Sequence, residues 1–269
     1  MQRGEWVPPE VDTEVPSIAR MWDYFLGGAH NFAIDRQVAE QAIKFKPDLP
    51  ELARQVRAFL HRAVGFMSDA GIDQFIDIGS GIPTYGNVHE KAQQLNPEAR
   101  IVYVDHDPVA VAHGKSILRG NDRVATVLHD LRDPEAIVVE PALRRLIDFD
   151  RPVGLLLVAV LHFVFDEYDP KGIVATLRDA LAPGSYLAIQ HATPDEQPES
   201  ALQMLEYVNS QSPDPMRWRT KAEITDFFEG FTIVEPGVVF LSQWRPDPHD
   251  EVEKNPERFA SYTAIGRKK

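Results

Sequence analysis

Residues 75–81, with the sequence FIDIGSG, constrain the fold more than any other part of the chain. The apolar residues are typical of a buried strand, and the glycines predict a tight turn directly after it. A helical pattern follows over residues 87–95, and a second apolar run at residues 101–104 ends in Asp105. This order of strand, glycine turn, helix and strand predicts a βαβ unit, which is the repeating unit of parallel nucleotide-binding sheets.

Asp105 stands at the tip of the second strand, where nucleotide-binding folds place an acid against a ribose. A dinucleotide site would have a third glycine at position 84, where this chain has Thr84, and Asp77 would oppose a pyrophosphate. The negative charge of Asp77 suits instead a ligand with an ammonium and a sulfonium group. The pattern Asp77-x-Gly79-x-Gly81 resembles the first motif of class I S-adenosylmethionine (SAM) methyltransferases. The alternative is a tight turn that binds no ligand.

Composition excludes several classes of protein. The net charge is −13, from 28 basic and 41 acidic residues, and the absence of a long basic run disfavours nucleic-acid binding. The chain has no cysteine, which excludes disulfides, thiolate zinc sites and cysteine nucleophiles. The longest apolar run, residues 153–165, is too short for a membrane span of about 20 residues. Residues 1–16 lack the apolar segment of a signal peptide, so a cytoplasmic location is expected.

The chain divides into a predicted N-terminal arm and helical cap, residues 1–70, and a predicted sheet domain, residues 71–269. In the first part, helices are expected from Ser17 to Leu26, from Asp35, and over a segment that ends near Gly71. In the second part, strands alternate with helical segments, which implies a parallel sheet with helices on both faces. The expected strands are near residues 74–78, 101–104, 124–128, 153–159, 185–190, 231–235 and 258–266, with a long loop at 236–256.

The N-terminal sequence ARMWDYFLGG at residues 19–28, followed by Asn31 and Phe32, resembles the opening of an actinobacterial family of SAM-dependent methyltransferases. Most of that family is uncharacterised. Residues 75–81, 103–108, 129–134, 237–239 and 244–246 are similar to further stretches of it, so the resemblance covers roughly residues 15–266. It implies a Rossmann-like class I α/β fold with a seven-stranded, mostly parallel sheet whose last strand is antiparallel. It does not supply the substrate.

The resemblance and the glycine turn together indicate a SAM site. Gly79, Ser80 and Gly81 would let the backbone approach the methionine part of SAM, and Asp77 would lie near its ammonium group. Asp105 would accept hydrogen bonds from both ribose hydroxyls.

The remaining expected contacts come from loops. His106 is expected to pack on the adenine or to be a plain loop histidine, and Asp130 and Leu131 to meet the adenine, although Asp130 could instead cap a helix. Tyr24, Gly28 and Asn31 are expected to face SAM as part of a lid. Their alternatives are a helix-surface aromatic, a helix stop and a local turn, respectively.

Candidate catalytic residues come from the ends of the fourth and fifth strands. Ala159 ends the fourth strand beside the cofactor, and His162 follows it. His162 is the first candidate general base and His191 the second, although an activated methyl donor requires neither. Asp166, Glu167 and Asp169 could hold Mg²⁺, but a solvated loop is favoured and no metal site is expected.

The sequence therefore predicts a SAM-dependent methyltransferase for a small-molecule oxygen or nitrogen acceptor. Two alternatives stay open: a SAM-binding sensor or scaffold without catalysis, and an NAD(P)-dependent oxidoreductase. The acceptor and the oligomeric state do not follow from the sequence.

Overall fold

The structure is a computed structural model that describes residues 11–83, 86–247 and 253–269. Thr84, which departs from the dinucleotide pattern, lies outside the described residues, as do most of the predicted N-terminal arm and residues 248–252 of the predicted long loop.

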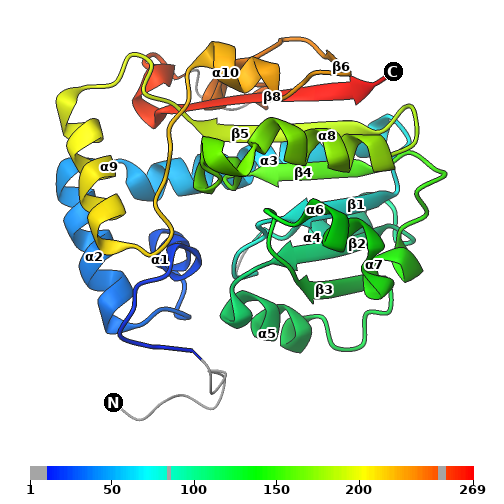
Figure 1. Ribbon diagram of the computed structural model, residues 1–269, viewed down its shortest axis with the longest axis horizontal. Helices are drawn as coiled ribbons and strands as arrows, with labels where there is room; N and C mark the ends of the chain where they lie inside the picture. The colour runs from blue at the N-terminus through cyan, green and yellow to red at the C-terminus, as the bar shows by residue number, and fades with distance from the viewer. Residues whose placement is uncertain (1–10, 84–85, 248–252) are drawn as a thin grey trace.

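One mixed sheet forms the centre of the molecule, with the strand order β3-β2-β1-β4-β5-β8-β6 (Figure 1). The strands β1 to β5 pair in parallel, and β8 is antiparallel to both β5 and β6. The predicted Rossmann-like architecture is confirmed: a mostly parallel seven-stranded sheet in which the last strand of the chain, β8, is antiparallel. The strands are β1 (Gln74–Ile78), β2 (Arg100–Asp105), β3 (Val124–Leu128), β4 (Gly154–Val158), β5 (Tyr186–Ala192), β6 (Phe231–Ile233) and β8 (Ser261–Lys268).

Helices cover both faces of the sheet (Figure 1). On one face lie α3 (Leu49–Asp69) and α4 (Val88–Leu95), and on the other α6 (Pro134–Val139), α7 (Pro141–Leu146), α8 (Pro170–Ala180) and α10 (Lys221–Asp226). The helix α5 (Pro108–Ile117) packs on β2 and β3. The helices α1 (Ile18–Phe25), α2 (Ala33–Phe45) and α9 (Glu199–Gln211) gather beyond the carboxyl ends of the parallel strands, with α1 between the other two and the sheet.

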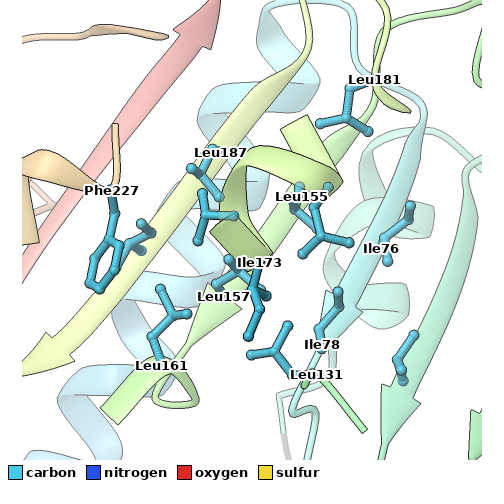
Figure 2. Packing of buried hydrophobic residues seen from close by; sticks show 14 of the residues in the cluster. Ile76, Ile78, Leu131, Leu155, Leu157, Leu161, Ile173, Leu181, Leu187 and Phe227 are labelled. Carbon is cyan, nitrogen blue, oxygen red and sulfur yellow. The ribbon is translucent and has the colours of Figure 1, made fainter. Parts of the chain in front are cut away.

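The alternation of side chains along β1 creates two separate apolar layers. Ile76 and Ile78 face the α8 side and pack with Leu155, Leu157 and Leu187 of the neighbouring strands (Figure 2). Phe75 faces the other side and packs with the apolar residues of α3. Helix α3 therefore shares a core with the sheet, although it belongs to the segment expected to act as a cap. Asp77 lies on the α3 side of β1, which determines which helix can reach it.

Two local predictions differ from the structure. The helix expected to begin at Asp35 begins at Ala33, because Asp35 sits in its first turn and accepts from the backbone N–H of Phe32 (2.7 Å) instead of preceding the helix. The predicted loop at 236–256 contains a short strand, β7 (Val239–Phe240), which pairs with β8.

Candidate functional site

The turn after β1 needs glycine at its first position. Gly79 has φ of +74°, and a Cβ atom there would lie 2.4 Å from Cγ2 of Val160, which follows β4. Gly81 also has a positive φ of +64°, but a Cβ atom there would meet no atom within 4 Å. The turn is therefore packed tightly on the β4 side and open at Gly81.

Asp105 closes the other side of this turn. Its Oδ2 accepts from the backbone N–H of Gly81 (2.7 Å), and its Oδ1 accepts from the backbone N–H of Asp107 (2.9 Å). Burial raises the pKa of Asp105, and these hydrogen bonds together with His106 oppose the rise. Each carboxylate oxygen keeps a second lone pair, so Asp105 can still accept two hydrogen bonds from a ligand.

Asp77 is a buried carboxyl group that lies in the field of a nearby guanidinium. Burial, opposed by Arg57 of α3 and assisted by Asp105, raises the pKa of Asp77 to about 7. The part of the chain that the structure describes gives the Arg57 guanidinium no hydrogen-bond partner, although Arg57 and Asp77 line the same cleft. One end of the cleft therefore carries a buried carboxyl group and a guanidinium group, each with donors or acceptors left for a ligand.

The cleft runs along the carboxyl ends of β1, β2 and β4, and α1 covers it. Its walls contain Gly79, Ser80, Gly81, Asp105, His106 and Ala159 of the predicted site. Ala159 has φ of +59°, and its N–H donates to the carbonyl oxygen of Gln190 (3.1 Å), which holds the chain in a turn after β4. Residues from α1 and the segment before it that the sequence did not single out also line the cleft: Ser17, Ile18, Ala19, Trp22, Asp23 and Leu26.

Asp23 is the centre of the N-terminal motif. Its Oδ2 accepts from the backbone N–H of His30 (2.7 Å) and from Nδ2 of Asn31 (2.8 Å), while its Oδ1 has no hydrogen-bond partner among the described residues. A Cβ atom at Gly28 would lie 2.0 Å from Oδ1 of Asp23, so only glycine leaves room for this carboxylate. Tyr24 instead donates to Oε1 of Glu40 on α2 (3.1 Å). Tyr24, Gly28 and Asn31 are absent from the walls of the cleft, and Asp23 and Trp22 face it in their place.

A smaller cavity continues the cleft past Asp105. It is lined by His106, Asp130, Leu131, Phe163 and Asp214, among others. Asp130 is paired with Arg132 (Oδ2 to Nη2, 2.5 Å), and both Asp130 oxygens accept from the guanidinium. Nε2 of His106 lies 3.6 Å from Oδ2 of Asp214, in the loop after α9. The loops after β2, β3 and α9 thus meet at this end of the site.

The two candidate bases differ in their surroundings. His191 Nδ1 lies 2.7 Å from the carbonyl oxygen of Ala192, and its Nε2 lies 3.1 Å from Nη1 of Arg219, so the ring donates from one nitrogen and accepts at the other. His162 is buried, and its Nδ1 has no hydrogen-bond partner within the described residues. Burial, together with His191 and Arg219, places the pKa of His162 well below its usual value. His162 is therefore neutral at pH 7 and has a ring nitrogen available to a ligand.

Metal binding has little support. Across residues 11–83, 86–247 and 253–269, no group of three or more His, Asp or Glu side chains is arranged to hold a metal ion. Asp166, from the acidic loop, is paired with Arg217 (2.7 Å) and Arg219 (2.8 Å). In the same described ranges, no helix is long and apolar enough to cross a membrane.

The strand order and the acidic cleft define a class I methyltransferase fold. The chain belongs to the family described as S-adenosyl methyltransferase, which matches residues 4–269. This confirms the predicted family and explains why the N-terminal motif and the glycine turn occur together.

Two solved structures are similar over nearly their whole length. A Thermobifida fusca protein described as a candidate methyltransferase is 42% identical, with a TM-score of 0.92, and the match covers 99% of this chain and all of that chain. A Streptomyces avermitilis protein of the DUF574 family is 40% identical, with a TM-score of 0.91, covering 96% of this chain and 99% of that one. The predicted actinobacterial kinship is confirmed.

A more distant structure shows the fold alone. An N-methyltransferase from Bradyrhizobium japonicum, in complex with S-adenosyl-L-homocysteine, is 14% identical with a TM-score of 0.50, covering 81% of this chain and 87% of that chain. None of the curated proteins matches the sequence.

Proposed function

We propose that this protein binds SAM and transfers its methyl group to an oxygen or nitrogen atom of a small molecule. The observation that carries the proposal is that Asp77 and Arg57 line the same cleft, together with Asp105. The methionine end of SAM carries an ammonium and a carboxylate, which match the carboxyl group of Asp77 and the guanidinium group of Arg57. A pyrophosphate at the glycine turn would be repelled by Asp77, which disfavours an NAD(P) ligand.

The rest of the cleft fits the nucleoside half. Asp105 would accept from the ribose hydroxyls through its two remaining lone pairs. The open backbone at Gly81 allows a close approach, because no side chain stands there. The adjoining cavity would hold the adenine between Leu131 and Phe163, whereas both oxygens of Asp130 are already engaged by Arg132.

SAM supplies a methyl carbon that is activated by the adjacent sulfonium. An acceptor O–H or N–H group must lose its proton when it is methylated, and His162 is the side chain assigned to accept it, because its Nδ1 has no hydrogen-bond partner among the described residues. The two nitrogens of His191 are already engaged with Ala192 and Arg219, so His191 supports the neighbouring loop and is not assigned the proton.

Calorimetric titration of the full chain with SAM, S-adenosylhomocysteine and NAD tests the cofactor half. SAM and its product should bind with one site per chain, and NAD should give no heat. Incubation with methyl-labelled SAM and fractions of small molecules then tests transfer. Tight binding of SAM with no labelled product from any fraction would support a non-catalytic sensor or scaffold, and binding of NAD in place of SAM would overturn the proposal.

A further inference from the structure

A second cavity lies beyond α1, on the side away from the cofactor cleft. Its lining residues come from α1, the junction between α2 and α3, α9, the segments around the ends of β5 and β8, and the loops after β4 and α9. Its walls are mainly apolar and include Met21, Phe25, Leu49, Met204, Val208 and Met216. Three of the five methionines in the chain are in these walls. Methionine side chains adapt to ligands of irregular shape, so this second cavity is suited to an apolar molecule. It is called the chamber below.

Three residues of the chamber walls each carry a buried polar atom that has no hydrogen-bond partner within the described part of the chain. These atoms are Nδ1 of His162, Oε1 of Gln190 and Nε1 of Trp218. The side chains are deeply buried, with exposed fractions of 3%, 3% and 7%. Buried polar atoms are almost always hydrogen-bonded, so three on residues that line one cavity point to a ligand that supplies the missing partners.

The chamber carries no uncompensated charge among its described lining residues. Lys46 is the only Lys or Arg among them, and its ammonium is held by the carbonyl oxygen of Arg258 and by Oδ1 of Asp48 (2.9 Å). His162 is neutral at pH 7 for the reasons given above. A charged ligand would therefore lose its hydration without gaining an opposite charge.

The chamber and the cofactor cleft share a wall. Ile18 and Trp22 of α1 line both cavities. After β4, Phe163 faces the cleft, whereas its neighbour His162 faces the chamber. The chamber therefore lies next to the cleft, on the side where the proposed function needs an acceptor.

We infer that this chamber binds the methyl acceptor, and that the acceptor is an uncharged, mostly apolar molecule with a hydroxyl or aromatic amine group at its polar end. Its O–H or N–H would donate to His162 or to Gln190, and its oxygen or nitrogen would accept from Trp218. The assignment of the ligand as the methyl acceptor rests on the proposed function, whereas the binding of such a molecule does not.

The test uses the full chain with 2-naphthol as the probe and 2-naphthoate as its charged counterpart of similar size. Calorimetry should show one 2-naphthol site per chain and binding of 2-naphthoate at least tenfold weaker. Met204→Trp, which fills the chamber, should weaken 2-naphthol binding at least tenfold and leave the affinity for S-adenosylhomocysteine unchanged. Met204→Leu, which conserves volume, is the matched control and should bind 2-naphthol as the native protein does.

A second measurement uses only the native protein, so it does not require that a variant folds. The indole N–H resonance of Trp218 in the native protein should shift on addition of 2-naphthol. Equal binding of 2-naphthol and 2-naphthoate, an unmoved Trp218 resonance, or a folded Met204→Trp protein with native 2-naphthol affinity would overturn the inference. Failure of S-adenosylhomocysteine to bind, with 2-naphthol binding intact, would instead reject the proposed function and keep the chamber as a ligand site.

Discussion

The hydroxyl of Ser17 donates a 2.6 Å hydrogen bond to Oδ2 of Asp107, which links the residue before α1 to the N-cap of α5. The backbone N–H of the same Asp107 donates to Asp105, the proposed ribose ligand. The backbone N–H of Ser17 in turn donates to Oδ1 of Asp35 (2.9 Å). The helix that covers the cleft is thus fixed directly to the loop that follows Asp105, and the stability of one depends on the other.

Ser17→Ala should therefore weaken both folding and cofactor binding. The loss of a hydrogen bond to a carboxylate should lower the free energy of unfolding by about 1.5–3 kcal/mol. The dissociation constant for S-adenosylhomocysteine should rise several-fold, because Asp107 and α1 lose their fixed positions. Urea unfolding and calorimetry measure the two effects. Ser116→Ala on the exposed face of α5 is the matched control and should change the free energy of unfolding by less than about 0.5 kcal/mol.

Asp105→Ala should remove the acceptor of the ribose hydroxyls. The lost hydrogen bonds to a charged group correspond to about 1.5–3 kcal/mol, or a rise of roughly tenfold to more than a hundredfold in the dissociation constant for SAM. The exposed Asp122, which pairs with Arg123 far from the cleft, provides the control Asp122→Ala. Native SAM affinity in a folded Asp105→Ala protein would reject the ribose assignment.

Arg57→Gln should discriminate between the two ends of the ligand. We expect weaker binding of S-adenosylhomocysteine, by about tenfold, because the carboxylate loses a charged partner. Binding of adenosine, which has no carboxylate, should not change. Arg54→Gln is a stringent control on the same helix, because Arg54 is exposed and pairs with Glu51 (2.6 Å). An equal loss of adenosine binding would show that Arg57 acts through the structure and not through the carboxylate.

The local part of this site could be predicted from the sequence, and the tertiary part could not. Asp77 and Asp105 follow from a glycine turn and two apolar strands, which are patterns within a short stretch of chain. Arg57 has no such signal, since it is one of several arginines on α3 and becomes a site residue only because α3 packs on the side of β1 that carries Asp77.

In the N-terminal motif, too, the sequence pattern does not identify residues that become buried through tertiary contacts. The helical spacing of the apolar residues in α1 leaves Arg20 and Asp23 off its apolar face, yet both are buried. Arg20 pairs with the buried Asp35 (2.8 Å), and Asp23 holds Asn31, so α1 is enclosed on its polar side as well. A hydrophobic pattern identifies one buried face of a helix, but it cannot identify a second face buried through paired charges.

The ion pair of His106 and Asp214 should make stability depend on pH. The pKa of His106 is raised to about 9, chiefly by Asp214, with burial opposing and Asp105 adding to the rise. Because the folded pKa exceeds the unfolded value of about 6.5, the pair stabilises the fold fully below about pH 6.5 and loses its effect as the pH rises through 9. The His106 side chain is 53% exposed, so we expect less than about 1 kcal/mol.

The measurement compares the unfolding of the native protein and Asp214→Asn at several pH values. The native protein should be the more stable at pH 6, and the difference should shrink by pH 10. Asp122→Asn serves as the control, because its partner Arg123 does not titrate in this range and its effect should not vary with pH. A constant difference for Asp214→Asn would mean that the pair with His106 contributes nothing.

Gly28→Ala should show whether the space that Gly28 leaves around Asp23 matters for the site. A methyl group there would meet Oδ1 of Asp23 at 2.0 Å, so the carboxylate must move and give up its hydrogen bonds to His30 and Asn31. We expect a loss of about 1–3 kcal/mol in the free energy of unfolding and weaker binding of S-adenosylhomocysteine, since Asp23 lines the cleft.

Gly65→Ala is the contrasting control, because a Cβ atom there would make only an ordinary 3.7 Å contact with Lys91. In the interior of α3 this change should stabilise the protein by about 0.5–1 kcal/mol. Equal effects of the two substitutions would show that Asp23 can move freely and that the loop after α1 does not hold it in place.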